Sequence, residues 1–360
     1  METKIKNYKS IEKVQMKLGR VTVLLGSPAA GKSNVLEAIA LATYFDRYAF
    51  YLDGEPLSKL VRTGRVSDIF HDLTKTVEIS VGANEWHQTR TLRMYFLVNE
   101  LNIELNNTDV PIKESDHTNY MFSYSGHPYK VDVDRIKNLL EGLGESVVAR
   151  LYGFDRFRDD VINSMVNGSE VEAPRGLLRE DGKNFGAVAR RHSEVFRDVN
   201  AELAELSRVE VKLLDDGRVV VFDNHIAMKP SATSESVLRI LYNLVGLSSA
   251  TSFTKLHGLE GRAVVLLEEP EGQIYPQFFN LLVKYIAKFS EVGYVVITTH
   301  NPILVSLLRD KLDATLYYVY RGDGGLTEAA ELDKDKLAEE LASAADILFM
   351  KPHEVLRFKR

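Results

Sequence analysis

Gly26-Ser27-Pro28-Ala29-Ala30-Gly31-Lys32-Ser33 matches the pattern G-x-x-x-x-G-K-S at every defined position. Glycines let backbone N–H groups turn inward and wrap phosphate oxygens, and the dipole of a following helix favours the same anion. In this pattern the Lys32 ammonium reaches the β- and γ-phosphates of a nucleotide, and the Ser33 hydroxyl ligates Mg²⁺. The stretch therefore predicts a site for ATP and Mg²⁺.

The residues on either side of this loop predict a strand before it and a helix after it. Residues 21–25 read Val-Thr-Val-Leu-Leu, a short apolar run typical of a strand that is buried on both faces. From Ser33 onward, apolar residues recur at helical spacing through Ala42. A chance glycine–lysine turn is the alternative, and the strand–loop–helix order favours the phosphate loop over it.

Two further apolar runs end in residues that metal-assisted phosphoryl transfer requires. Residues 263–267 lead into Glu268 and Glu269, which we expect to lie near Mg²⁺ and to polarise the attacking water, respectively. Residues 294–298 lead toward His300, at the strand edge where open α/β sheets bind ligands. For Glu268 and Glu269 the alternative is a pair of solvated acids after an ordinary buried strand. For His300 the alternative is a structural histidine. The phosphate loop elsewhere in the chain favours the catalytic roles.

The composition of the chain excludes several chemistries. The 360 residues include 45 Lys plus Arg, 51 Asp plus Glu and no cysteine, and the formal net charge is −6. A chain without cysteine has no disulfide, no thiolate nucleophile and no Cys-ligated metal. Residues 1–9 lack the apolar core of a signal peptide, and no apolar run approaches the roughly 18 residues of a membrane span. We therefore expect a cytoplasmic globular protein that does not use a membrane.

One basic stretch raises the question of nucleic acid as a partner. It holds Arg175, Arg179, Lys183, Arg190, Arg191 and Arg197, interspersed with Glu180, Asp181 and Glu194. Mixed charges of this kind favour a solvated helix face. The negative net charge also weighs against a dedicated nucleic-acid binder, for which a basic domain is usual. DNA stays open as a partner on this evidence.

Together these motifs resemble the ABC-type ATPases of the SMC/RecF-like head group, in a short form without coiled-coil arms. Residues 4–11, Lys-Ile-Lys-Asn-Tyr-Lys-Ser-Ile, look like the family's N-terminal strand, and residues 31–39 are similar to its GKSN-LEAI sequence. Residues 269–276 are similar to its DEPE and LHP pair. Residues 234–241, Ser-Glu-Ser-Val-Leu-Arg-Ile-Leu, look like its signature segment, which in the family completes the ATP site of a partner chain.

The resemblance implies an α/β fold, the P-loop NTPase fold of the ABC head type. This fold has a mostly parallel sheet with flanking helices, an antiparallel β-lobe and a helical insertion. Period-two alternation over 77–105 fits the lobe, and apolar spacing predicts one amphipathic helix over 184–206. We expect a split nucleotide-binding core (1–75 and 209–330), an antiparallel β-lobe (76–130), a helical insertion carrying part of the signature side (131–208) and a C-terminal helical tail (331–360).

The resemblance also implies a set of site residues and partners. Glu269 and His300 are the implied catalytic residues, and Ser33 and Glu268 the implied metal ligands. The residues implied to bind nucleotide are Gly26, Ser27, Pro28, Ala29, Ala30, Gly31, Lys32, Ser33, Asn34, Ser234, Glu235 and Ser236. For Ser234 a helix N-cap is an alternative role that is compatible with the first. The implied partners are a second copy of the chain, joined through ATP, and a separate effector protein.

Four residues depart from the family pattern. Pro28 stands where the family usually has Asn, Glu268 replaces Asp, Ser236 replaces the signature glycine, and Tyr275 replaces His. The side chain of Ser236 can obstruct the approach of backbone to phosphate. The glutamine loop that senses the metal in the family is not evident, and residues 68–71 occupy a comparable position.

Two functions follow from the motifs and their departures. The first is an ATPase with slow hydrolysis, which dimerises around ATP and couples the cycle to a partner or to a DNA-related process of repair, maintenance or defence. The alternative is a nucleotide-gated binding switch with little or no hydrolysis, which the substitutions at Glu268 and Ser236 favour.

Overall fold

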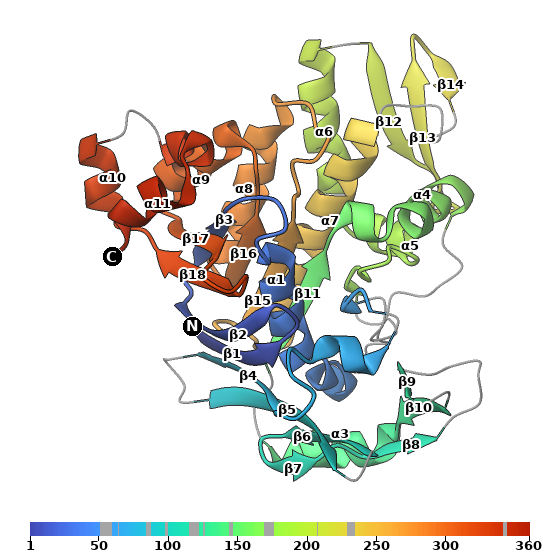
Figure 1. Ribbon diagram of the computed structural model, residues 1–360. Helices are drawn as coiled ribbons and strands as arrows, with labels where there is room; N and C mark the ends of the chain where they lie inside the picture. Colours follow the sequence, from blue (N-terminus) through green and yellow to red (C-terminus); the bar gives the residue numbers. More distant parts are fainter. Residues whose placement is uncertain are drawn as a thin grey trace.

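A six-stranded sheet forms the centre of the part of the molecule that is described in the computed structural model (Figure 1). The described residues are 1–50, 60–63, 65–83, 88–97, 100–114, 122–124, 127–143, 147–168, 176–206, 208–228, 235–340 and 344–360. In spatial order the strands are β11 (Val148–Tyr152), β15 (Ala263–Glu268), β16 (Tyr294–Thr298), β3 (Val21–Leu25), β17 (Thr315–Arg321) and β18 (Thr327–Glu331). The first five are parallel and β18 is antiparallel to β17.

The continuous apolar runs in the sequence are explained by burial of this sheet on both faces. All five residues of β3 are buried. Val23 and Leu25 belong to one hydrophobic core, whereas Leu24 belongs to a second core on the opposite face. Strand β15 follows the same rule, since alternate side chains enter opposite cores. The predicted strands over 21–25, 263–267 and 294–298 are therefore confirmed.

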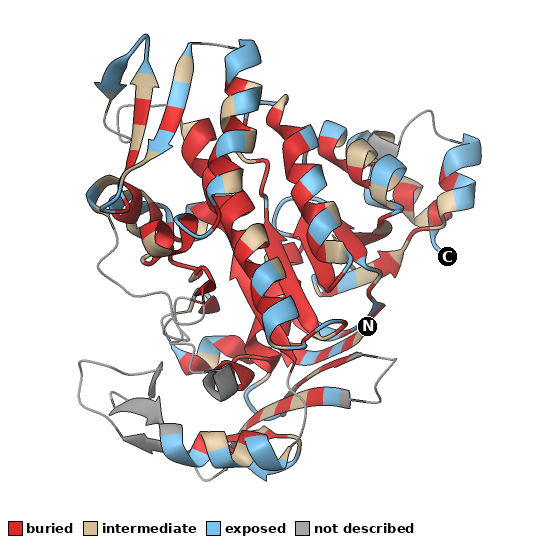
Figure 2. Cartoon of the chain, turned by 180° about the vertical axis from the view of Figure 1, so that it is seen from behind, coloured by how far each residue is buried: buried red, intermediate tan, exposed pale blue. Residues whose placement is uncertain are grey.

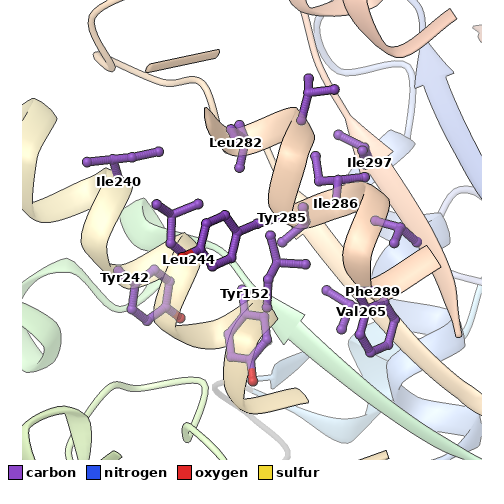
Figure 3. Close-up of a cluster of buried hydrophobic side chains, with 14 of the residues drawn as sticks. Tyr152, Ile240, Tyr242, Leu244, Val265, Leu282, Tyr285, Ile286, Phe289 and Ile297 are labelled. Carbon is purple, nitrogen blue, oxygen red and sulfur yellow. The ribbon is translucent and has the colours of Figure 1, made fainter. Parts of the chain in front are cut away.

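Three long helices cover one face of the central sheet. They are α7 (Glu235–Leu256), α8 (Phe278–Ser290) and α9 (Pro302–Leu312). Figure 3 shows Tyr242 of α7 and Ile286 of α8 in one cluster with Val265 of the sheet. Seen from behind in Figure 2, the helices on this face are buried where they meet the sheet and exposed on their outer sides.

Helix α1 (Lys32–Ala42) and a second, antiparallel sheet cover the opposite face. The second core joins α1 to both sheets, because it contains Leu36 of α1, Ile79 of the antiparallel sheet and Leu266 of the central sheet. In spatial order the antiparallel strands are β2 (Ile11–Lys17), β1 (Glu2–Tyr8), β4 (Val77–Ala83), β5 (Gln88–Leu97), β6 (Glu100–Leu105) and β7 (Thr108–Asp109). The N-terminal hairpin therefore shares one sheet with residues 77–109.

The remaining elements surround these layers. Two small antiparallel sheets contain β8 (Ile112–Glu114), β9 (Phe122–Tyr124) and β10 (His127–Val131), and β12 (Val209–Leu213), β13 (Val219–Asp223) and β14 (Ile226–Met228). The other helices are α3 (Val133–Gly142), α4 (Arg158–Asn167), α5 (Phe185–Ala189), α6 (Ser193–Leu206), α10 (Lys334–Glu340) and α11 (Pro352–Val355). The 3₁₀ segments are η1 (Phe45–Phe50), η2 (Val66–Ile69), η3 (Phe154–Arg156), η6 (Ala344–Phe349) and η7 (Leu356–Phe358). Within the described ranges, no helix combines the length and the apolar character needed to span a bilayer.

The prediction of one continuous helix over 184–206 is wrong. The structure has two helices there, α5 and α6, which are separated at residues 190–192. The backbone N–H of His192 donates to the carbonyl of Ala189 three residues earlier, which closes a tight turn at the end of α5. The His192 ring is buried, and its Nδ1 lies 3.0 Å from Ser248 Oγ on α7. Packing of this side chain against α7 explains the break that apolar spacing alone did not show.

The basic stretch is largely engaged in contacts within the chain. The buried Asp181 carboxylate receives Arg179 Nε at 3.1 Å and Lys183 Nζ at 3.1 Å. Arg190 Nη1 donates to the carbonyl of Asp215 at 3.0 Å. Arg175 lies outside the described residues. Because Glu180 and Asp181 are buried, this stretch differs from the solvated helix face that the mixed charges favour.

Candidate functional site

The glycine-rich loop between β3 and α1 has a backbone that only glycine permits at two positions. Gly26 has φ 141° and Gly31, which caps α1, has φ 105°. A Cβ atom on Gly26 would collide with the Val319 carbonyl oxygen, and one on Gly31 with the Thr327 hydroxyl. Ala29 between them also lies in the left-handed region, with φ 59°. Alternation of this kind turns N–H groups inward and forms an anion-binding concavity.

The loop is held against the β17–β18 hairpin by two hydrogen bonds, and Ser10 contacts one of their donors. Arg321 Nε donates to the carbonyl of Ala29 at 3.0 Å, and Thr327 Oγ1 donates to the carbonyl of Ala30 at 2.9 Å. Ser10 Oγ lies 2.7 Å from Thr327 Oγ1. Because the carbonyls are bonded outward, the shape of the loop is fixed before any ligand arrives.

The predicted nucleotide-binding residues of this loop differ in exposure. Ser27, Pro28 and Ala29 are exposed at its tip. Asn34 is turned toward the N-terminal hairpin, where its Nδ2 donates to Ser10 Oγ at 2.7 Å. The side chain of Asn34 therefore joins the start of α1 to the N-terminal hairpin.

Lys32 already points into the loop. Its Nζ donates to the carbonyls of Gly26 at 2.8 Å and Ser27 at 3.0 Å. Burial lowers the pKa of Lys32 to about 8, against the opposing effect of the Glu269 carboxylate. An ammonium group held in this position fits the phosphates of a nucleotide.

Ser33 and Glu268 meet where α1 begins and β15 ends. The nearby Ser33 hydroxyl is one of the groups that lower the pKa of the Glu268 carboxyl group. A hydroxyl and a carboxylate are oxygen donors of the kind that Mg²⁺ accepts beside nucleotide phosphates. These residues therefore fit the predicted metal, with the loop supplying the phosphate site next to it.

Two arginine side chains, which the sequence did not single out, also meet Glu268. Its Oε2 accepts from Arg156 Nη2 at 2.9 Å and from Arg62 Nη2 at 2.9 Å. Arg156 Nη2 also donates to Glu37 Oε1 on α1 at 2.9 Å. Burial raises the pKa of Glu268, but the charges of Arg156 and Arg62 outweigh this effect and hold the pKa below its usual range. Arg156 thus bridges two buried carboxylates.

In the sequence, Glu37 is the residue that could have indicated this network of buried charges. It lies on α1 between apolar residues that are buried, and only 1% of its own side chain is exposed. A buried carboxylate needs a cation or several hydrogen-bond donors. Lys9 Nζ at 2.5 Å and Arg156 supply the cations, but their positions in the sequence give no indication of this.

Replacing Arg156 with glutamine should lower the free energy of unfolding by about 3 kcal/mol, because two buried carboxylates lose a shared cation. Arg156→Lys keeps the charge and should lose less. Arg218→Gln is a matched control, since Arg218 pairs with Asp216 on the surface and such a pair contributes about 0–1 kcal/mol. Urea denaturation measures all three. Equal stability of the Arg156→Gln variant and the wild type would contradict the network.

Glu269 and His300 lie together at the open edge of the sheet. His300 Nε2 is 3.6 Å from Glu269 Oε1, and both side chains are substantially exposed. Burial of part of the ring and the nearby Lys32 ammonium lower the pKa of His300, while Glu269 opposes them. Lys32, Glu269 and His300 therefore lie close enough to influence one another electrostatically. They follow the carboxyl ends of β3, β15 and β16, and the sequence predicted this placement for Glu269 and His300.

The signature residues have contacts of their own. Glu235 Oε1 accepts from Arg158 Nε at 2.7 Å, and Glu235 Oε2 accepts from Arg239 Nη2 at 3.2 Å. Ser236 Oγ accepts from the backbone N–H of Tyr275 at 2.8 Å. Ser234 lies outside the described residues. A role of this segment toward a second chain's nucleotide stays a prediction.

Residues 68–71, compared above with the metal-sensing loop, are bound near the N-terminal hairpin. Asp68 Oδ2 accepts from Thr63 Oγ1 at 3.0 Å, and His71 Nδ1 lies 2.9 Å from the carbonyl of Lys9. The charged side chains that pair with the Glu268 carboxylate are those of Arg156 and Arg62, which lie outside this segment.

Comparison with known proteins places the fold. No protein-family model matches the chain, and a search of curated proteins found no match. Among solved structures, the chain is similar to an Smc head bound to the C-winged helix domain of ScpA, with a TM-score of 0.57 and 15% identity over 94% of this chain and 98% of that chain. It is also similar to an Smc head domain with an extended coiled coil, bound to the C-terminal domain of ScpA from Pyrococcus furiosus, with a TM-score of 0.53 and 12% identity over 94% and 97%.

These similarities define the architecture. The chain has the P-loop α/β fold of ABC-type ATPase heads. Within that class, its fold is that of an SMC head domain, which confirms the predicted resemblance and fold class.

Proposed function

We propose that the chain is an ABC-type ATPase that binds ATP with Mg²⁺ and hydrolyses it slowly. The observation that carries this proposal is the meeting of Lys32, Glu269 and His300 at the carboxyl edge of three adjacent parallel strands. Ligands bind at this edge in open α/β sheets. The Ser33–Glu268 pair, which fits Mg²⁺, lies beside it.

Each residue has a role in the proposed hydrolysis. Lys32 binds the β- and γ-phosphates, and Ser33 and Glu268 hold the metal. Mg²⁺ held by these residues would supply positive charge that offsets the charge developing on the phosphates. Glu269 orients the attacking water and accepts its proton, and His300 contacts the γ-phosphate. Slow turnover is expected because Glu268 is shared between the metal and two guanidinium groups.

The affinity for ATP should fall as the pH rises above 8. Burial lowers the pKa of Lys32 to about 8 in the free protein, whereas bound phosphates favour the ammonium form. Near neutral pH the ammonium is already present. Above the lowered pKa, binding must take up a proton, and affinity falls by up to about tenfold per pH unit. Calorimetry in buffers of different ionisation enthalpy counts the protons, and an absence of uptake at about pH 9 would contradict this.

We extend the proposal to a head-to-tail dimer. In it, residues 234–236 of one chain approach the nucleotide held by the phosphate loop of another, and the chains separate after hydrolysis. The fold similarity to SMC heads supports this arrangement. Glu235 and Ser236 begin α7, so the N-terminal end of that helix adds a dipole that favours phosphate.

A nucleotide-gated switch with little or no hydrolysis is the second candidate. The observation that favours it is the double ion pair on Glu268, which must loosen for the metal to share this carboxylate. Steady-state phosphate release separates the two. A value well above that of the Lys32→Ala variant supports an ATPase, whereas tight ATP binding with release at background supports the switch.

A separate partner protein is the proposed recipient of the cycle. Both similar Smc heads are bound to a domain of ScpA, which is a property of those proteins. By analogy, we propose a cytoplasmic ATPase that acts with a partner or in a DNA-related process. DNA binding should weaken steeply with salt, and its absence at low salt, with and without ATP, would remove DNA from the proposal.

A further inference from the structure

We propose that Glu271 is a positioning residue that holds the His300 imidazole beside the Glu269 carboxylate. The sequence motifs assign this side chain no role. The inference rests on the proposed function, since Glu269 and His300 are its catalytic pair. Glu271 does not itself contact the reacting atoms, and its effect is transmitted through the backbone of the neighbouring loop.

Glu271 lies in the loop after β15 and reaches across to the loop after β16. One of its oxygens, Oε1, accepts two hydrogen bonds there. Thr299 Oγ1 donates at 2.5 Å and the backbone N–H of His300 donates at 3.1 Å. The bond to the His300 N–H fixes the peptide from which the imidazole extends.

The same contacts fix the start of the following helix. Thr299 Oγ1, which donates to Glu271, also accepts from the backbone N–H of Asn301 at 3.0 Å. Asn301 is the N-cap of α9, and its side chain accepts from the N–H groups of Ile303 and Leu304. Glu271 is therefore the first acceptor in a chain of hydrogen bonds that ends at the cap of α9.

Glu269 is also bonded to the end of β16, one residue before Thr299. Its backbone N–H donates to the carbonyl of Thr298 at 3.0 Å and lies 3.2 Å from Thr298 Oγ1. The two loops are thus joined at Glu269 and again at Glu271. Both ends of the 3.6 Å contact between Glu269 and His300 are held by these cross-loop bonds.

The environment of Glu271 suits an uncharged carboxyl group. The residue is 8% exposed, and Oε2 is buried with no hydrogen-bond partner among the residues that the structure describes. Burial raises the pKa of Glu271, and the charge of Glu269 adds to the effect. A neutral acid still accepts through its carbonyl oxygen. Glutamine has the same shape and acceptor, so it should replace Glu271 in this role.

Kinetics of three variants test the proposal. Glu271→Ala should lower kcat about tenfold to a hundredfold, because correct placement of an acid–base group contributes on this scale. The Kd for ATP should stay within about threefold, since Lys32 and the phosphate loop are intact. Glu271→Gln should restore kcat to within about threefold of the wild type. Glu291→Ala, at the exposed end of α8, is the matched control and should leave kcat unchanged.

A second readout does not depend on hydrolysis. The chain has 9 histidines, so the His300 signal in a spectrum of histidine-labelled protein can be assigned with a His300→Gln variant. In the nucleotide-free protein, Glu271→Ala should raise the pKa of His300 toward that of a solvated imidazole, because the ring leaves the partly buried site near Lys32. Glu271→Gln should leave the titration of His300 unchanged.

The outcomes separate this proposal from the proposed function. An unchanged His300 titration in folded Glu271→Ala overturns the positioning role. A Glu271→Gln variant as defective in kcat as Glu271→Ala also overturns it, because the carboxyl group would then act in the chemistry itself. If the wild type releases no phosphate, the ATPase proposal fails, while the titration still decides the role of Glu271.

Discussion

Replacing Lys32 with alanine should lower the affinity for ATP about a thousandfold, or ~4 kcal/mol. The Lys32 ammonium is buried within the phosphate loop and bonded to the carbonyls of Gly26 and Ser27. Nothing else placed inside the loop carries its charge, so the phosphates would lose their main cation in a poorly solvated site. Isothermal titration calorimetry with ATP and Mg²⁺ measures the loss.

A matched lysine variant controls for the change of charge. Lys255→Ala removes an exposed lysine from α7 and should bind ATP like the wild type. Thermal melting of Lys32→Ala should show that the fold is retained, since the Lys32 side chain donates its hydrogen bonds to carbonyls within the loop. Unchanged ATP affinity in folded Lys32→Ala would refute the assignment of the phosphate loop.

Replacing Glu269 with glutamine should lower hydrolysis about a thousandfold and trap an ATP-bound dimer. Glutamine keeps the size of the side chain but cannot accept the proton of the attacking water, and loss of a general base costs about 10²–10⁴-fold. ATP binding should be retained, because removing a negative charge near Lys32 does not weaken the phosphate contacts. Phosphate release and light scattering measure the two effects.

Two controls sharpen the dimer test. Glu260→Gln changes an exposed glutamate and should hydrolyse ATP and elute like the wild type. The double variant Lys32→Ala, Glu269→Gln should stay monomeric, since dimerisation depends on bound ATP. If Glu269→Gln remains a monomer at every ATP concentration, the dimer proposal is wrong, even where hydrolysis has fallen.

The parts of the fold that local sequence determines were predicted well. The runs over 21–25, 263–267 and 294–298 predicted central strands because a strand buried on both faces must be apolar throughout. The phosphate loop was also predictable from sequence. Its glycines are required by positive φ angles within the loop and by the close approach of the adjacent hairpin. The sequence therefore placed Lys32, Ser33, Glu268, Glu269 and His300 on the correct elements.

The parts that were missed depend on contacts between distant residues. Arg156 lies 119 positions from Glu37 and 112 positions from Glu268, so no local pattern joins them. The break between α5 and α6 likewise depends on His192 meeting Ser248 on α7. A single sequence shows which residues are charged or apolar, but not which of them become neighbours. Glu271 was missed for the same reason, since the two groups that donate to its carboxyl oxygen lie on the loop after β16.

Helix α1 lies between the two sheets, and this placement limits how the molecule can respond to a nucleotide. Nearly all of its residues are buried, and its side chains pack in the same core as both sheets. Close-packed interiors do not deform continuously, so α1 cannot tilt without disturbing two layers at once. The phosphate end of the site is therefore stationary. We therefore expect motion that accompanies binding and release to arise in elements other than α1, such as the N-terminal end of α7.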